Sequence, residues 1–185
     1  MGVLFRGGHH GHGLLHFHPE QSALTSSFLS TDAKKSDAHA AHTLEAAAWS
    51  PLLSAEERAK LVHGLVSKDC VIFGASGPEH PALVGPAGYL AWQDAWRAAI
   101  PDLRSSVVGL GSSDPAVSSF HTVQWTRGGT FAGPADLFGV APTGGGMTVH
   151  GVTCLELKGA QVVKVHVYVE MSRHVAHACV GQVGA

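Results

Sequence analysis

The sequence predicts an α+β fold, in which a strongly curved antiparallel sheet packs on helices that precede it in the chain. Two observations carry this prediction. Apolar residues at helical spacing occur within the first hundred residues, and β-branched runs separated by turn signals follow from residue 103 onward. The regular alternation of strand and helix that a parallel sheet requires is not seen.

The helical segments before residue 103 have recognisable start and stop signals. Ser54 and Glu57 have the spacing of a capping box, and apolar residues then recur at helical spacing, so a helix is predicted over 54–67. Another helix begins at Pro86, which suits the first helical position, and ends before Pro101. Its aromatic face consists of Tyr89, Trp92, Trp96 and Ile100.

The predicted strands are short, β-branched and bounded by glycine or proline. The first is Cys70–Phe73, and 77–85 is expected to be a loop. The later strands are expected over 103–110, 117–127, 147–157 and 162–170, with turns at 111–115, 142–146 and 158–159.

The composition of the chain indicates which classes of partner to expect. Of its 185 residues, 45% are hydrophobic and 14% are charged, which supports a sizeable core. The net charge is −2 and the charges are scattered, so nucleic acid is not expected as a partner. Because the longest apolar runs are a few residues, no membrane span is expected.

The cysteines point to a reducing compartment. Cys70, Cys154 and Cys179 are far apart, and no CxxC pair occurs, so reduced thiols are predicted, with no disulfide framework and no zinc site. We expect a cytoplasmic protein and leave an organelle open.

The segment before residue 54 divides by composition. Glycine and five histidines dominate residues 1–18, where we expect a solvated tail or a docking arm rather than a structured metal site. An Ala/Ser-rich segment follows, and its residues 37–49 are compatible with a helix. The predicted organisation is an N-terminal arm over 1–18, a helical extension or linker over 19–53, the main domain over 54–178 and a C-terminal tail over 179–185.

The last strand carries the main candidates for chemistry. Side chains alternate between the two faces of a strand, so Val163, Val165, Val167 and Val169 would share an apolar face, while His166, Tyr168 and Glu170 would share the other. If this second face lines an apolar pocket, desolvation would raise the pKa of Glu170 towards a value useful for general acid/base catalysis. The alternative is that the face meets water.

Other candidates are single residues. His80, His121, Gln124 and His150 are each more often structural or surface residues, and Trp92 and Trp96 are more often core than a stacking platform. There is no nucleotide-binding glycine fingerprint, no GxSxG elbow and no HExxH motif, so classical hydrolase chemistry is unsupported.

Several motifs, in order, resemble those of one family. They are Gly85-Pro86-Ala87-Gly88-Tyr89, Ala98-Ala99-Ile100-Pro101-Asp102-Leu103-Arg104, Val123-Gln124-Trp125-Thr126, Gly129-Thr130-Phe131-Ala132-Gly133 and Leu137-Phe138-Gly139-Val140-Ala141-Pro142-Thr143-Gly144. Over about residues 54–178 the chain resembles the SnoaL-like polyketide cyclases of the NTF2-like superfamily.

The resemblance implies a cone, in which a bent sheet closed by helices surrounds a hydrophobic pocket, often in a homodimer. It also implies cyclase chemistry without cofactor or metal, for which Glu170 occupies the position of the family's acid/base aspartate and His166 that of a frequent tryptophan. Tyr168, His150, Gln124, Trp96 and Trp92 would then bind a hydrophobic, polyketide-like substrate. Phe131 departs from the family pattern, because it replaces the usual histidine.

Two functions therefore remain open. One is a cofactor-independent cyclase or isomerase, or a binder of hydrophobic small molecules. The other is a non-catalytic subunit that docks into a larger protein assembly through the cone and residues 1–45. The fold alone does not decide between them.

Overall fold

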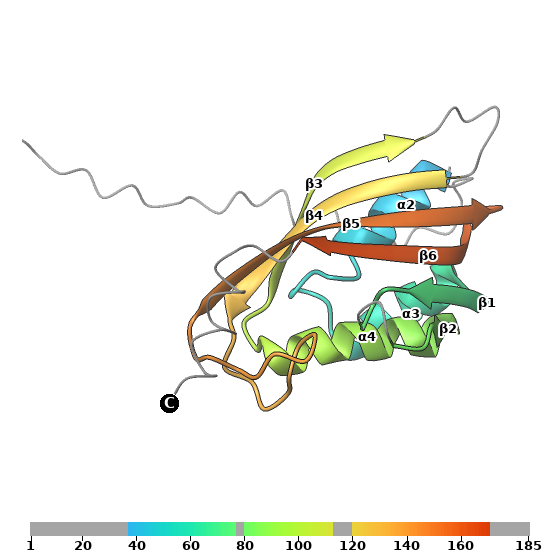
Figure 1. Cartoon of the computed structure of the whole chain (residues 1–185). Helices are drawn as coiled ribbons and strands as arrows, with labels where there is room; N and C mark the ends of the chain where they lie inside the picture. The colour runs from blue at the N-terminus through green and yellow to red at the C-terminus, as the bar shows by residue number, and fades with distance from the viewer. Residues whose placement is uncertain (1–36, 77–79, 113–119, 171–185) are drawn as a thin grey trace, which may run out of the picture. The chain divides into compact units, whose positions relative to one another are not determined.

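A computed structural model describes residues 37–76, 80–112 and 120–170 of the chain. These residues form a six-stranded sheet with strand order β2-β1-β6-β5-β4-β3, and helices that pack on one face of it (Figure 1). In chain order the elements are α2 (Asp37–Ala46), α3 (Ala55–Leu65), β1 (Val66–Phe73), β2 (Leu83–Val84), α4 (Gly85–Ala99), β3 (Arg104–Ser112), β4 (Phe120–Thr130), β5 (Gly146–Lys158) and β6 (Gln161–Glu170).

The sheet is antiparallel between all neighbouring strands except β1 and β6, which run parallel. A hairpin forces its two strands to be antiparallel, but β1 and β6 are joined through most of the domain and are free of that constraint. β4 and β5 are the long strands, and Figure 1 shows them bending along their length. The predicted α+β fold with a curved sheet on helices is confirmed, with one parallel pair added.

The helices form close to where the sequence signals place them, but the helix predicted over 54–67 ends at Leu65, and the strand predicted over 70–73 already begins at Val66. Ser54 caps α3, because its hydroxyl accepts a hydrogen bond from the backbone N–H of Glu57 and the Glu57 carboxylate accepts one from the backbone N–H of Ser54. Pro86 lies in the first turn of α4, as predicted. The helix expected within 37–49 is α2, and its Ala40, Ala41 and Leu44 are fully buried.

The alternation of β6 differs from the prediction at one end. Val165 and Val167 are buried on the face that the helices cover, but the buried residue before them is Val162 rather than Val163. The pairing register of β5 and β6 shifts at this point, because Glu156 pairs with Lys164 and Leu157 with Val162. Val163 is the extra residue of a β-bulge, which reverses the alternation before it.

The remaining predictions on local structure are mixed. The predicted loop 77–85 contains the two-residue strand β2 at its end. The predicted strand over 117–127 is β4, whose described part starts at Phe120, and the turn predicted at 111–115 lies largely outside the described residues. The arm 1–18, residues 19–36 and the tail 179–185 also lie outside them.

Candidate functional site

The two faces of the sheet have different surroundings. On the helix face, side chains of β4 and β5 such as Val123, Trp125 and Leu155 are buried, and α2 packs on both strands. On the outer face, no described helix covers the strands, and Tyr168 is 61% exposed. The two faces therefore offer different kinds of site.

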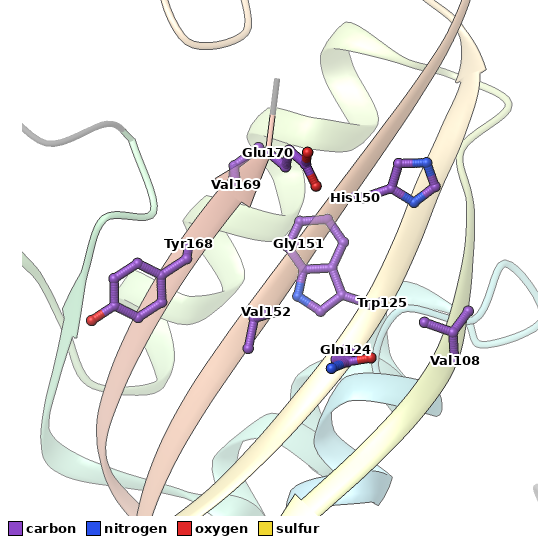
Figure 2. A pocket seen from close by; sticks show the side chains of 9 residues that line it. All are labelled: Val108, Gln124, Trp125, His150, Gly151, Val152, Tyr168, Val169 and Glu170. Carbon is purple, nitrogen blue, oxygen red and sulfur yellow. The ribbon is translucent and has the colours of Figure 1, made fainter. Parts of the chain in front are cut away.

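The outer face has a hollow of about 580 Å³, here called the outer hollow. Four of the predicted site residues surround it, and Val152 lies between them (Figure 2). The β-sheet register explains this grouping, because Val152 pairs with both Gln124 and Tyr168, and His150 pairs with both Thr126 and Glu170. The structure thus brings together Gln124, His150, Tyr168 and Glu170.

The side chains of this group are in contact with solvent. Gln124, His150, Tyr168 and Glu170 are all exposed, so this face meets water, which is the second of the two alternatives left open by the sequence. The Thr126 hydroxyl oxygen and His150 Nδ1 are 3.0 Å apart, which fixes the orientation of the ring. The outer hollow is therefore an open, polar-rimmed depression.

His166 lies on the outer face but does not line this hollow. Its ring stacks on Phe73, with the ring centroids 4.7 Å apart and the planes 16° from parallel. It is four residues from Glu170, which corresponds to roughly 13 Å along a strand at ~3.3 Å per residue. The predicted catalytic residues Glu170 and His166 are therefore not placed to act on the same bond.

Trp92 and Trp96 lie on the other side of the sheet from the Glu170 group. Both are buried on α4, and Trp96 packs edge-on against Trp125 of the helix face, with centroids 5.9 Å apart. The sheet separates them from the outer hollow. Of the seven predicted site residues, four therefore line the outer hollow, the two tryptophans lie on the helix face, and His166 stacks on Phe73.

The space between α2, α4 and the sheet is filled by a polar and aromatic cluster. Arg127 Nη2 lies 2.7 Å from Glu45 Oε2, and both side chains are fully buried. The guanidinium lies between two indole rings, 3.3 Å from the Trp49 centroid and 3.8 Å from that of Trp125. Tyr89 donates a hydrogen bond to Glu45 at 2.8 Å and accepts one from the Trp49 indole at 3.1 Å.

Burial acts against both charges of this ion pair. It raises the pKa of Glu45, while the nearby Arg127 opposes the shift, and it lowers the pKa of Arg127 to about 10, with Glu45 opposing. Burial also raises the pKa of Tyr89 well above its ordinary value, so its phenol stays protonated and donates. These groups hold one another in place and leave little room for a ligand.

A smaller hollow of about 190 Å³, here called the inner hollow, remains beside α4. The indoles of Trp92 and Trp96 line it, and the N–H group of each is buried with no hydrogen-bond partner in the described part of the chain. Buried polar groups are nearly always hydrogen-bonded, so two unpaired donors on residues that line the same hollow require an explanation. The rim carries Ser76, His80 and Asp136, together with the Leu137–Gly139 turn.

Phe138 in this turn has an unusual backbone conformation. Its φ is +54° and that of Gly139 is +74°, which are left-handed values at both central positions of the turn. A bulky residue is uncommon there, and strained conformations cluster at functional sites. The Phe138 ring packs edge-on against Trp96, with the centroids 5.5 Å apart.

Sequence reasoning did not single out Glu45, Arg127, Phe138 or Asp136. The sequence could have indicated that Arg127 is buried, because it follows Val123 and Trp125 at a spacing of two residues on β4 and therefore lies on the same face of the strand. The glycine after Phe138 marks a turn, but nothing local indicates that the phenylalanine adopts a positive φ.

Other chemistry finds no support in the described residues. Among them, no three or more His, Cys, Asp or Glu side chains lie close enough to hold a metal ion. Cys70 and Cys154 are free thiols, as predicted, and burial raises the pKa of Cys70 to about 12; Cys179 lies outside the described residues. None of the described helices has the length and apolar character needed to span a membrane.

Solved structures share this fold. A candidate SnoaL-like polyketide cyclase from Jannaschia sp. CCS1 superposes with a TM-score of 0.60 at 18% identity, covering 80% of this chain and 94% of the other. AclR, a candidate hydroxylase from Streptomyces galilaeus, gives 0.57 at 20% identity, with 80% and 87% covered. IdmH, a candidate polyketide cyclase from Streptomyces antibioticus, gives 0.55 at 18% identity, with 80% and 99% covered.

The sequence itself provides the family assignment. No curated protein matches the chain. The model of the SnoaL-like polyketide cyclase family matches residues 46–174, which is most of the chain and includes every strand and the helices α3 and α4. The chain therefore belongs to the SnoaL-like polyketide cyclase family.

Proposed function

We propose that this domain binds a small, mainly apolar molecule in the inner hollow beside α4. The observation that carries the proposal is that Trp92 and Trp96 both line the hollow, and that the indole N–H group of each is buried with no partner among the described residues. An unpaired buried donor costs about 1–3 kcal/mol. A ligand that accepts hydrogen bonds from these groups would recover that free energy.

Two further features support the inner hollow as the site. Phe138 is strained and packs on Trp96 at its edge, and membership of the polyketide cyclase family favours a small organic ligand. Apolar walls with a few polar groups are typical of ligand pockets. His80 and Asp136 are the titratable side chains of the rim, and they are the groups that would exchange a proton with a molecule bound there.

The test uses the four tryptophans as reporters. In protein labelled with ¹⁵N at the indole nitrogens, Trp49 and Trp125 already donate, to Tyr89 and Thr153, whereas Trp92 and Trp96 do not. Titration with a panel of cyclic and aromatic compounds should shift the Trp92 and Trp96 signals first. If calorimetry shows that compounds of the panel bind, and the Trp92 and Trp96 signals both stay unchanged, the inner hollow is not the binding site.

A second candidate is acid/base chemistry in the outer hollow. The observation in its favour is that Gln124, His150, Tyr168 and Glu170 surround one depression. Trp125 borders that depression and not the inner hollow, so a ligand of the outer hollow should move the Trp125 indole signal and leave Trp92 unchanged. Glu170→Gln should then weaken its binding.

The docking-subunit alternative receives no such support. It depended on residues 1–45, of which the structure describes only 37–45. That part is helix α2, whose Leu44 and Glu45 are buried within the domain itself.

A further inference from the structure

We infer that two copies of this chain pair along the outer edge of β3, with Leu110 at the twofold axis between them. The six-stranded sheet of one copy would then continue into the sheet of the other. This inference concerns the edge of the sheet and does not depend on the function proposed for the inner hollow.

β3 is the long edge strand of the sheet. It stands at one end of the strand order, and β4 is its only neighbouring strand in the described part of the chain (Figure 1). In such a strand, every second residue directs its backbone N–H and C=O groups away from the neighbour, where another strand can bind them. β3 has nine residues, whereas β2 at the opposite edge has two. The β3 edge therefore offers the longer row of backbone groups.

β3 has few of the features by which proteins prevent edge pairing. Charged side chains and proline are common means of prevention. Arg104 is the first residue of the strand, and Ser105–Ser112 contains neither a charge nor a proline. One such feature is present, because the register with β4 shifts between Val107 and Gly109 and makes Val108 the extra residue of a bulge. Regular pairing is therefore confined to the segment after the bulge.

Exposed apolar side chains lie on both faces of this edge. Val108 is 64% exposed and lines the outer hollow, so it belongs to the outer face. Leu110 is 47% exposed and pairs with Val123, a buried residue of the helix face, so it lies on the helix side. α2 packs on β3 without covering Leu110. An added strand would cover apolar surface on both faces, so we expect a β-strand as the occupant.

A second copy of β3 fits this edge. In an antiparallel pair around a twofold axis perpendicular to the sheet, each face of one copy continues into the same face of the other. An axis at Leu110 places the two Leu110 side chains opposite each other, and Gly109 opposite Gly111 of the second copy. The leucines gain an apolar contact, and the glycines have no side chains that could clash. A slip of one residue would set Leu110 against the wrong face.

The charges of the strand permit this pairing. Arg104 lies six positions before Leu110, so the two Arg104 residues of the dimer would be roughly 40 Å apart at ~3.3 Å per residue. This exceeds the Debye length of about 10 Å at 0.1 M salt. A net charge of −2 per chain adds little repulsion. Because the regular segment is short, we expect a weak dimer that forms in a concentration-dependent way.

The first test is sedimentation velocity of the full chain over a series of concentrations. We expect a monomer that converts to a dimer as the concentration rises. Leu110→Lys sets two like charges opposite each other at the axis and should raise the dimer Kd at least about tenfold. Val84→Lys is the matched control, because Val84 is 58% exposed on β2 at the opposite edge and its replacement should leave the Kd unchanged.

Hydrogen exchange of the wild-type chain tests the position of the contact without any substitution. Amide exchange of the segment 109–112 should slow as the concentration rises, because pairing gives its outward N–H groups acceptors. The strand β2, residues Leu83–Val84, should exchange at the same rate at every concentration.

Three outcomes would overturn the inference. One is a monomer at every concentration. Another is a dimer that Leu110→Lys leaves unchanged; if Tyr168→Lys disrupts that dimer, the copies meet through the outer face of the sheet instead. The third is protection of 109–112 that does not vary with concentration, since another part of the same chain would then cover the edge. None of these outcomes affects the test of the inner hollow.

Discussion

Arg127 and Glu45 form an ion pair inside the domain, with 2.7 Å between Nη2 and Oε2 and with neither side chain exposed. The residues are 82 positions apart in the sequence, and their bond joins β4 to α2. The region that matches the family begins at Ala46, the last residue of α2, so this contact ties the helix that precedes that region to the sheet.

Replacing Arg127 alone should strongly destabilise the domain. Arg127→Met leaves the Glu45 carboxylate buried without its cation, which typically costs about 3–5 kcal/mol of unfolding free energy. Urea unfolding followed by tryptophan fluorescence measures the change. The double variant Glu45→Met with Arg127→Met should recover most of the loss, since it leaves no buried charge.

The exposed ion pair of the sheet provides the control for this prediction. Lys164 Nζ and Glu156 Oε2 are 3.6 Å apart, and the Lys164 side chain is 45% exposed. Lys164→Ala should cost less than about 1 kcal/mol. A loss for Arg127→Met no larger than that for Lys164→Ala would contradict the structural role assigned to the buried pair.

Gly151 should not tolerate a side chain. A Cβ atom there would lie 2.2 Å from the Trp125 indole, whose other face is against Arg127 and whose N–H donates to Thr153. We expect Gly151→Ala to lower the unfolding free energy by about 1–3 kcal/mol or more through overpacking. Gly64→Ala is the matched control, because nothing lies within 4 Å of its added Cβ in helix α3, and it should raise stability by about 0.5–1 kcal/mol. Similar effects of both substitutions would show that Trp125 can move.

Local signals in the sequence predict the elements of the fold well. The capping box at Ser54, the proline at the start of α4 and the alternation of β6 each act within a few residues, and the structure contains all three. The bulge at Val163 was missed because it depends on the pairing of β6 with β5, which a single strand does not encode.

The candidate site was harder to predict, because alternation tells which residues share a face but not what covers that face. The sequence left open whether the polar face of β6 lines a pocket or meets water. In the structure the helices cover the apolar face, where Val165 and Val167 are buried, as burial of apolar surface requires. Glu170 and Trp96 therefore lie on opposite sides of the sheet. The buried pair of Glu45 and Arg127 joins residues far apart in the chain, and no local pattern predicts such a contact.

Ala160 occupies a position that favours glycine. It follows Gly159 in the two-residue turn between β5 and β6, and both have left-handed φ values, +59° for Gly159 and +61° for Ala160. Ala160→Gly should raise the unfolding free energy by about 1 kcal/mol, because a side chain is penalised in this conformation. The hydrogen bond from the Ala160 backbone N–H to Asp37 Oδ1 is kept.

A second alanine tests whether this gain is specific to the turn. Ala132 is exposed and has a φ value outside the left-handed region, so Ala132→Gly should lower stability by about 0.5–1 kcal/mol. Differential scanning fluorimetry on both variants gives the comparison. A lower melting temperature for Ala160→Gly would mean that its methyl group contributes packing that outweighs the backbone strain.

Because of Asp102, the free energy of unfolding should depend on pH in the acid range. Its carboxylate accepts hydrogen bonds from the backbone N–H of Thr130 at 2.6 Å and from the Thr130 hydroxyl at 2.9 Å, and these bonds hold the pKa of Asp102 below its ordinary value of 3.8. The unfolded chain therefore binds more protons than the folded one near this pH, so stability rises with pH there. The contribution is present above about pH 4 and is lost as the pH falls through the lowered pKa.

Asp102→Asn removes this titration and keeps an acceptor oxygen. The difference in urea midpoint between wild type and Asp102→Asn should be largest near pH 6 and should shrink as the pH is lowered towards 2.5. Thr130→Val deletes the hydroxyl donor and keeps the backbone N–H. The urea midpoints of Thr130→Val and of the double variant Thr130→Val with Asp102→Asn should therefore differ with pH less than those of wild type and Asp102→Asn do. A midpoint difference that stays constant from pH 6 to pH 2.5 would show that the Thr130 hydrogen bonds do not favour the ionised carboxylate.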